Sequence, residues 1–285
     1  MSKGIVLFAF GDRAYYNMAY NMALSIKATS KLKVALVHDL HNFKLKPMPA
    51  ENWDVFDKLV PLQKKHTDAG QIKCNMYKYM PYEENLYLDV DGCALKSLDP
   101  LMDELTAKEG WFYTQVNGKG GKSDDIPYSI WATNDDIWEF FGLEEDAVLP
   151  AIQSSYVFVR KCDEAKAFFD KVAKNYDKKF DKRKLTMRWG GSIPDELIYS
   201  GTMAQLGMNT DAHGGRHIYF GWKNKETISE VFEGWYILAI YGGRRLVKVR
   251  YKELYDRHMR NICKQMNTRH MYKVAPLLKS KHANK

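Results

Sequence analysis

The sequence has few cysteines and no long apolar run. We therefore expect no disulfide framework, and a reducing, cytoplasmic setting is the simplest interpretation. The apolar run that opens the chain breaks at residues 11–12, which predicts neither a signal peptide nor a membrane-spanning segment, and no later run is long enough to span a bilayer. The cysteines are widely scattered and form no Cys-x-x-Cys pair: Cys74, Cys93, Cys162 and Cys263.

The sequence also has no internal repeat, no low-complexity linker and no even spread of charge. The formal net charge of the 285 residues is +8. Residues 244–285 hold 13 Lys and Arg against two acids, so this segment carries +11 and the rest of the chain sums to −3. Such a segment favours polyanions, namely nucleic acid, an anionic membrane or a phosphorylated glycolipid, although a solvated tail would have the same composition.

Apolar runs and helical patterns alternate along the first 90 residues. Hydrophobic residues make up 45% of the chain, which is enough for a substantial core. The alternation predicts an α/β fold with a mostly parallel central sheet covered by helices, and ligands of such sheets bind beyond the carboxyl ends of the strands. We expect strands at 4–10, 33–39, 55–60, 85–91, 111–116, 152–160, 234–243 and 246–250, helices at 14–28, 72–80, 134–141, 163–176, 194–207 and 251–267, and a mobile loop at 117–127.

Two aspartates end the buried stretch "NLYLDVDG". Residues i and i+2 of a strand point to the same side, roughly 6.5–7 Å apart, so Asp89 and Asp91 can both reach a divalent cation while Val90 points away. Mg²⁺ or Mn²⁺ held by carboxylates keeps positions open for phosphate oxygens and can neutralise a leaving diphosphate. Gly92 would let the chain turn and a ligand approach closely. A metal site that holds a nucleotide-sugar is therefore one interpretation.

The same stretch allows other interpretations. Asp-Gly is a common turn dipeptide, so the motif could be only structural. A calcium-binding EF-hand loop fails, because Cys93 stands where an oxygen ligand is required. "DVDGCAL" also comes close to the D-x-D-G-T-L motif of haloacid-dehalogenase-type phosphatases. That motif has a hydroxyl residue in place of Cys93 and normally ends the first strand, whereas here it ends about the fourth.

The order of several short motifs resembles the GT-A glycosyltransferases, in particular the glycogenin-like retaining group. "GDRAYY" is similar to the N-D-A-Y turn after the first strand, "QIKC" to the lysine before the D-x-D strand, "IQSSYVFVR" to F-N-S-G-V-F-V, and "IPDELIY" to the D-Q helix start. The resemblance covers roughly residues 4–225. It implies a GT-A type, Rossmann-like domain over 1–225 and a basic C-terminal subdomain or tail over 226–285 that contacts an acceptor or a membrane.

The resemblance also implies roles for particular residues. Asp12 would contact the nucleobase, and Tyr15 or Tyr16 would stack on it. Asp195 or Glu196 would orient the sugar or stabilise positive charge at its anomeric carbon. The predicted donor-binding residues are Phe10, Gly11, Asp12, Tyr15, Tyr16, Lys73, Val90, Ser154, Ser155, Lys223 and Lys225, and the predicted catalytic residues are Gln153, Asp195 and Glu196.

The last family motif, H-F-x-G-x-x-K-P-W, would supply a third metal ligand and a lysine for the diphosphate. "RHIYFGWKNK" departs from it, since His217 comes one residue early, Ile218 takes the ligand position and no proline follows Lys223. The predicted ligands of Mn²⁺ (or Mg²⁺) are therefore Asp89, Asp91 and His217, with His213 as the alternative histidine. Either histidine could instead be a loop residue or an acceptor contact.

Together these features predict a metal-dependent glycosyltransferase that uses a nucleoside-diphosphate sugar, expected to be a UDP-sugar. Retention is favoured over inversion, and the leaving phosphate would then take the acceptor's proton; in an inverting reaction Asp195 or Glu196 would be the base. The acceptor hydroxyl is expected on a modified base in DNA, with a lipopolysaccharide or glycolipid at a membrane surface as the alternative. The rivals are the phosphatase and a non-enzymatic nucleic-acid-binding protein, which leaves "DVD" unexplained.

Overall fold

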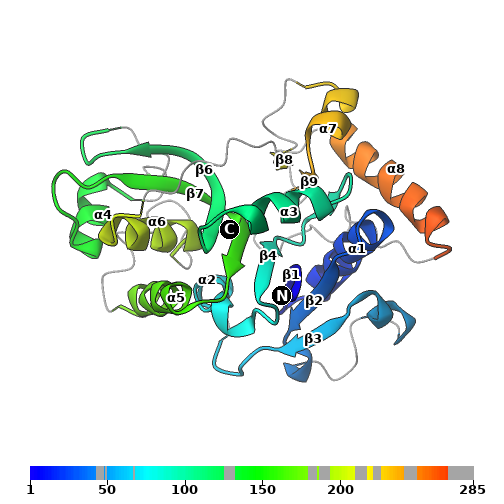
Figure 1. Cartoon of the computed structure of the whole chain (residues 1–285), viewed down its shortest axis with the longest axis horizontal. Coiled ribbons are helices and arrows are strands. Elements are labelled where there is room, and N and C mark those ends of the chain that lie inside the picture. Colours follow the sequence, from blue (N-terminus) through cyan, green and yellow to red (C-terminus); the bar gives the residue numbers. More distant parts are fainter. Residues whose placement is uncertain are drawn as a thin grey trace, which may run out of the picture. The chain divides into compact units, whose positions relative to one another are not determined.

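The computed structural model divides into two compact units, each assembled from separated stretches of the chain (Figure 1). Unit 1 comprises Met1–Leu62, Asn85–Glu109 and Gly215–Lys285, and unit 2 comprises Gln63–Glu84 and Gly110–Gly214. The structure describes residues 1–42, 48, 50–66, 68–124, 132–178, 185, 193–208, 217–220, 226–240 and 249–268.

Unit 1 is built on strands in the order β3-β2-β1-β4. The strands are β1 (Lys3–Ala9), β2 (Lys33–His38), β3 (Lys58–Pro61) and β4 (Glu84–Leu88, whose first residue belongs to unit 2). β1 pairs in parallel with β2, and β2 with β3. Residues 4–9 of β1 are all buried, as expected for a strand covered on both faces. The third strand begins later than predicted, because residues 50–55 form a 3₁₀ turn, η2 (Ala50–Val55).

Helices and a small second sheet complete unit 1. The second sheet has the order β5-β9-β8, with β5 (Gly92–Ala94) antiparallel and β8 (Ile218–Phe220) parallel to β9 (Ile237–Ala239). Within it, β9 covers only part of the strand expected at 234–243. The remaining elements are α1 (Arg13–Thr29), η1 (Leu40–Asn42), α3 (Asp99–Ala107), α7 (Ile228–Gly234) and α8 (Val249–Gln265).

Helix α8, drawn in orange, lies beside α1 in Figure 1. Its start at Val249 shows that the last two residues of the strand predicted at 246–250 are helical, while 246–248 lie outside the described residues. Asn21 on α1 donates a hydrogen bond of 2.9 Å to the Tyr255 hydroxyl. The apolar side of α8 is buried in unit 1 and consists of Leu254, Tyr255, Met259 and Ile262.

Unit 2 pairs β6 (Phe112–Gly120) with β7 (Leu149–Arg160) as antiparallel neighbours. Its helices are α2 (Ala69–Cys74), η3 (Met76–Tyr79), α4 (Asn134–Phe141), α5 (Asp163–Tyr176) and α6 (Asp195–Gln205). The helix predicted at 72–80 is divided at Asn75, whose side-chain amide donates to the Gln71 carbonyl at 3.0 Å and so competes with the helical backbone. Part of the core is an aromatic cluster of Phe112, Phe168, Phe169 and Tyr199, with ring centroids 5.1–6.3 Å apart.

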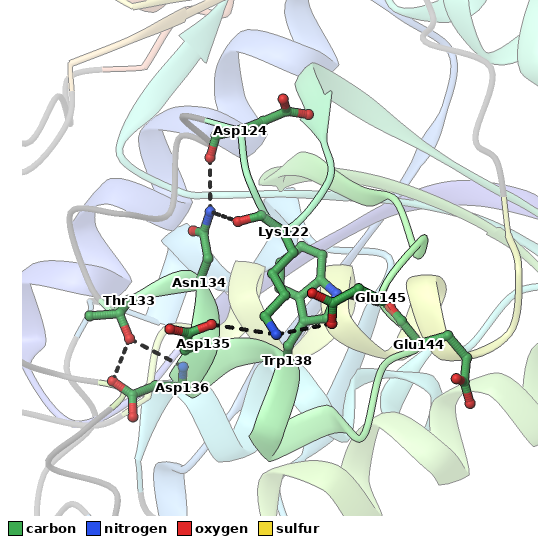
Figure 2. A network of polar contacts seen from close by, with 9 residues as sticks. All are labelled: Lys122, Asp124, Thr133, Asn134, Asp135, Asp136, Trp138, Glu144 and Glu145. Carbon is green, nitrogen blue, oxygen red and sulfur yellow. Dashed lines mark hydrogen bonds and ion pairs between the residues drawn. The ribbon is translucent and has the colours of Figure 1, made fainter.

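The loop predicted at 117–127 is largely strand and turn through residue 124, since β6 continues to Gly120. Figure 2 shows the polar network that holds the turn, with Lys122 Nζ 3.0 Å from Glu145 Oε2 and 3.5 Å from Asp135 Oδ1. Asn134 donates to the carbonyls of Lys122 and Asp124 at 2.7 and 2.8 Å. The hydrogen bond that Lys122 donates to the Glu145 carboxylate raises the pKa of Lys122. Residues 125–127 lie outside the described part of the chain.

The predicted fold class is confirmed: the protein is a mixed α/β fold with a mostly parallel central sheet flanked by helices. The predicted division into a domain over 1–225 and a C-terminal subdomain or tail over 226–285 stays a prediction. The same holds for the predicted role of residues 226–285 as an acceptor or membrane contact. None of the helices in the described residues is both long and apolar enough to cross a membrane.

Candidate active site

The predicted metal-binding aspartates follow β4 directly. Asp89 and Asp91 are half-buried, and Val90 between them is buried, which agrees with the predicted alternation of sides. The Tyr87 hydroxyl donates a hydrogen bond to Asp89 Oδ1. The Asp91 carbonyl accepts a hydrogen bond of 2.9 Å from the backbone N–H of Ile240. Hydrogen bonds within the protein therefore position the side chain of Asp89 and the backbone of Asp91.

Gly92 has a different role from the one expected for it. It begins β5, where an added Cβ would lie 2.5 Å from the Leu238 carbonyl oxygen of β9. The close approach that requires glycine here is thus made by a neighbouring strand and not by a ligand. Cys93 is fully buried in the same strand, and burial raises the pKa of its thiol. A neutral, buried thiol does not replace the hydroxyl of the phosphatase motif, which weakens that interpretation.

The donor set of the two aspartates fits a divalent cation, because Mn²⁺ and Mg²⁺ prefer carboxylate oxygens. Within the described ranges, however, no three His, Cys, Asp or Glu side chains come together as a metal-binding group. His217 is buried, with its ring centroid 6.2 Å from that of Tyr236. The structure therefore does not bring His217 into a group with the aspartates. The other predicted residues of this segment, His213, Lys223 and Lys225, lie outside the described residues.

An exposed aromatic pair lies at the turn after β1. The Tyr15 ring is 47% exposed and stacks beside Phe10, with centroids 6.3 Å apart and planes 18° from parallel. Gly11 between them has φ +75°, a conformation that glycine adopts readily. Asp12 is exposed, and its Oδ1 caps α1 by accepting the Ala14 N–H at 2.9 Å. The turn thus offers an aromatic face and a carboxylate to a planar ligand.

The interpretation of Tyr16 as a stacking residue needs correction, because its side chain is fully buried. Its hydroxyl donates to Asp39 Oδ1 at 2.6 Å, while Asp39 Oδ2 accepts from the Gly11 N–H and from Asn42 Nδ2, both at 3.0 Å. Burial, with this hydrogen bond, raises the pKa of Tyr16. Sequence reasoning missed Asp39, although an acid directly after the buried strand at 33–38 was a usable signal.

Unit 2 brings together a predicted donor-binding residue and a predicted catalytic residue. Lys73 Nζ lies 3.6 Å from Asp195 Oδ2, and the two side chains are only 17% and 15% exposed. The Tyr199 hydroxyl donates to the Lys73 carbonyl at 2.8 Å, which ties α6 to α2. Asp195 and Glu196 form the first turn of α6, where the helix dipole favours negative charge.

Three of the predicted catalytic and donor-binding residues, Gln153, Ser154 and Ser155, lie at an irregularity of β7. Thr114 is paired with Val157 but Gln115 with Gln153, so Ser154, Ser155 and Tyr156 have no counterpart on β6. Gln153 is half-buried, whereas Ser154 and Ser155 are 0% and 4% exposed. Among the residues that the structure describes, neither serine hydroxyl has a hydrogen-bond partner. Bulges of this kind occur often beside active sites, and buried hydroxyls without partners call for a physical explanation.

Comparison with solved structures places this arrangement in a known fold. The chain is similar to the bifunctional glycosyltransferase WbbM in its apo form, with 11% identity and a TM-score of 0.58 over 98% of this chain and 52% of that chain. This chain thus spans about half the length of WbbM. It is also similar to the galactosyltransferase LgtC, solved with donor and acceptor sugar analogs, with 12% identity and a TM-score of 0.51 over 90% of this chain and 95% of that one.

These likenesses confirm the predicted GT-A type fold. No protein-family model and no curated protein matches the sequence. At this level of identity the fold alone is established, so the chemistry has to be argued from the residues themselves.

Proposed function

We propose that this chain is a glycosyltransferase that takes its sugar from a nucleoside-diphosphate sugar, expected to be a UDP-sugar. The observation that carries the proposal is the pair Asp89 and Asp91 directly after β4, in a fold shared with LgtC and WbbM. Ligands of open α/β sheets bind beyond the carboxyl ends of the strands, where these carboxylates lie.

Unit 1 offers groups that can bind the nucleotide part of a donor. Tyr15, supported by Phe10, supplies a face for the base, and Asp12 is the carboxylate beside it. Asp89 and Asp91 would hold Mn²⁺ or Mg²⁺, which when bound neutralises charge on the departing diphosphate. His217 or His213 as a further ligand, and Lys223 or Lys225 as contacts of the diphosphate, remain part of the proposal.

Unit 2, taken by itself, offers groups that can bind a sugar. Gln153, Ser154 and Ser155 can exchange hydrogen bonds with sugar hydroxyls. Asp195, whose charge Lys73 balances, or its neighbour Glu196 would orient the sugar or stabilise positive charge at the anomeric carbon. Retention remains favoured, with the leaving phosphate taking the acceptor's proton; in an inverting reaction one of the two carboxylates would be the base.

The acceptor part of the proposal depends on α8. Arg257, Arg260 and Lys264 are exposed and follow the i, i+3, i+7 spacing of a single helix face. The apolar side of the same helix is buried in unit 1, so it is not available to enter a membrane. This supports contact with a polyanion through charge, and we favour a hydroxylated base in DNA over a glycolipid. In a duplex, such a base would have to be flipped out.

The donor site can be tested with a thermal-shift panel of nucleoside diphosphates, with and without Mn²⁺. A ligand at 100 times its Kd stabilises the folded protein by about 2.7 kcal/mol, which is a readily measured shift. We expect a metal-dependent shift with one nucleotide, UDP in the first instance, that vanishes in Asp91→Ala. No shift with any nucleotide would contradict the proposal.

The acceptor can be tested separately by retention on DNA at increasing salt. Neutralising the basic face in Arg257→Gln/Arg260→Gln/Lys264→Gln should weaken retention and reduce its salt dependence, because fewer phosphate contacts release fewer counterions. Equal retention on neutral and anionic polymers would count against a polyanionic acceptor. Retention on anionic vesicles but not on DNA would favour the glycolipid.

A further inference from the structure

We infer that strand β6 forms the second half of the sugar subsite, and that its residues Thr114, Gln115 and Asn117 are positioning residues for Gln153 and the β7 bulge. The inference rests on the proposed function and deepens it. It assigns the bulge to the polyhydroxylated part of the donor and not to its phosphates. All of the contacts that carry it lie within unit 2.

Thr114 spans the bulge from the opposite strand. Its hydroxyl lies 2.9 Å from the Gln153 carbonyl oxygen and 2.8 Å from the Tyr156 carbonyl oxygen, and can donate its proton to either. These carbonyls lie on each side of Ser154 and Ser155. Thr114 is buried, so water does not compete for the contact. One hydroxyl therefore fixes the distance across the irregular segment, in place of the missing ladder hydrogen bonds.

A chain of side-chain amides at the exposed edge of β6 orients Gln153. Gln115 Nε2 donates to Asn117 Oδ1 at 3.2 Å, and Asn117 Nδ2 donates to Gln153 Oε1 at 3.3 Å. Since the amide oxygen of Gln153 is used as an acceptor within the protein, its NH₂ group is the part that can serve a ligand. β6 thus makes Gln153 a hydrogen-bond donor toward the subsite.

The buried atoms around the bulge indicate what kind of ligand would fit. In the described structure, Ser154 Oγ, Ser155 Oγ and Gln115 Oε1 are all buried without a hydrogen-bond partner. Gln115 Oε1 can only accept, the NH₂ of Gln153 can only donate, and the serine hydroxyls can do both. A phosphate dianion offers acceptors alone and would leave Gln115 Oε1 unpaired. Sugar hydroxyls offer donors and acceptors, so a polyol satisfies the whole set.

The inference predicts that β6 contributes to binding of the sugar and not of the nucleotide. The variant Asn117→Asp keeps the size of the side chain but removes the N–H that serves Gln153 Oε1. The Gln153 NH₂ group would then turn toward the new carboxylate, and its oxygen would face the ligand. Thr114→Val removes the hydroxyl that spans the bulge, and Thr114→Ser restores it.

The test is titration calorimetry with Mn²⁺, comparing UDP with UDP-glucose and UDP-galactose. We expect Asn117→Asp and Thr114→Val to weaken binding of the preferred UDP-sugar by about tenfold, the value of one lost hydrogen bond, while UDP affinity stays within about twofold. Thr114→Ser should bind like the wild type. Lys119→Ala, an exposed change on the same strand, is the control and should change neither affinity.

Other results would overturn the inference. Equal losses for UDP and UDP-sugar, or no loss for either, would show that β6 has no specific role at the sugar. Thermal unfolding of each variant without ligand shows whether the variant is folded. If Thr114→Ser loses affinity for the UDP-sugar as Thr114→Val does, the proposed role of the hydroxyl is also contradicted. If the wild type binds neither UDP nor any UDP-sugar, the proposed function itself fails.

Discussion

The turn after β1 in unit 1 and the β7 bulge in unit 2 differ in how their buried polar side chains are paired. In unit 1, Asp39 receives hydrogen bonds from Tyr16, Gly11 and Asn42, and Asp12 caps α1. In unit 2, Ser154 and Ser155 are buried at the bulge, with no partner for either hydroxyl among the described residues. Buried polar groups cost stability unless they are paired.

This difference indicates which of the two regions has hydrogen-bonding groups left for a ligand. The strand ends of unit 1 are held by the protein's own hydrogen bonds, so they are organised before any ligand arrives. The bulge of unit 2 carries hydrogen-bonding capacity that the protein does not use. Substitutions in unit 1 should therefore change stability, whereas substitutions at the bulge should change binding. The proposed metal-binding pair, Asp89 and Asp91, is the exception in unit 1, because the role that we propose for it is to hold a ligand.

The largest effect on activity is expected from substitution of the proposed metal-binding pair. Asp91→Asn should lower the transfer rate by on the order of 100-fold, because a metal contributes several kcal/mol of charge stabilisation and a neutral amide holds it poorly. The melting temperature without Mn²⁺ should change little. Asp103→Asn, which removes an exposed carboxylate of α3 paired with Lys3, is the matched control and should keep full activity. If Asp91→Asn kept full activity, the proposed role of the metal in the transfer reaction would be wrong.

The next effect concerns the paired carboxylate of unit 1. Asp39→Asn should lower the free energy of unfolding by about 1–3 kcal/mol, because its amide NH₂ would face a hydrogen-bond donor. Tyr16→Phe removes the hydroxyl that donates to Asp39 Oδ1 and accepts from the Asp39 N–H, and should also cost about 1–3 kcal/mol. Urea unfolding of both variants measures the two values. If Asp39→Asn were as stable as the wild type, the view of this turn as an organised scaffold would be wrong.

A smaller effect of opposite sign is expected in unit 2. Ser154→Ala and Ser155→Ala remove hydroxyls that have no partner in the described structure, so each apo variant should be as stable as the wild type or more stable by up to about 1 kcal/mol. Donor affinity should nevertheless fall by about tenfold, the value of one hydrogen bond. Thermal unfolding without ligand and calorimetry with UDP-sugar give the two readings. A large loss of apo stability would mean that the hydroxyls serve the fold itself.

The smallest expected effect is the pH dependence of unit 1. Burial lowers the pKa of His258 from 6.5, although its hydrogen bond to the Ala94 carbonyl, 2.8 Å long, opposes the shift. The folded protein therefore binds fewer protons than the unfolded chain, so stability is complete above pH 6.5 and falls as the pH drops below it. The slope from one such group is at most about 1.4 kcal/mol per pH unit.

His258→Gln should reduce this slope without abolishing it, since burial also lowers the pKa of His38 in the same unit. Urea unfolding between pH 5 and 8 makes the measurement. Stability that increases on acidification in the wild type would contradict the sign.

The sequence predicted most of the elements because their signals are local. The buried run at 4–10 and the helices at 134–141 and 163–176 all follow from apolar spacing and end residues. Other features depend on contacts distant in sequence. The bulge of β7 exists only in relation to β6, and Gly92 is required by Leu238, some 150 residues away.

Some residues of the candidate site could likewise be predicted from local sequence signals, and others could not. Asp89 and Asp91 stand out because two acids end a buried run. The choice between Tyr15 and Tyr16 depends on which side of α1 is covered, and the adjacent positions give no local signal for that. The contact between Lys73 and Asp195 requires the packing of α2 on α6, and was not foreseen for the same reason.

The most direct test of glycosyl transfer is product analysis after incubation with UDP-sugars and Mn²⁺. The account predicts release of UDP, with the sugar passed to water or to an acceptor, no orthophosphate, and loss of the reaction in Asp91→Asn. The contrary result is release of orthophosphate from a simple phosphomonoester, lost in Asp89→Asn, with no UDP formed from any UDP-sugar. That outcome would identify a phosphatase and not a glycosyltransferase.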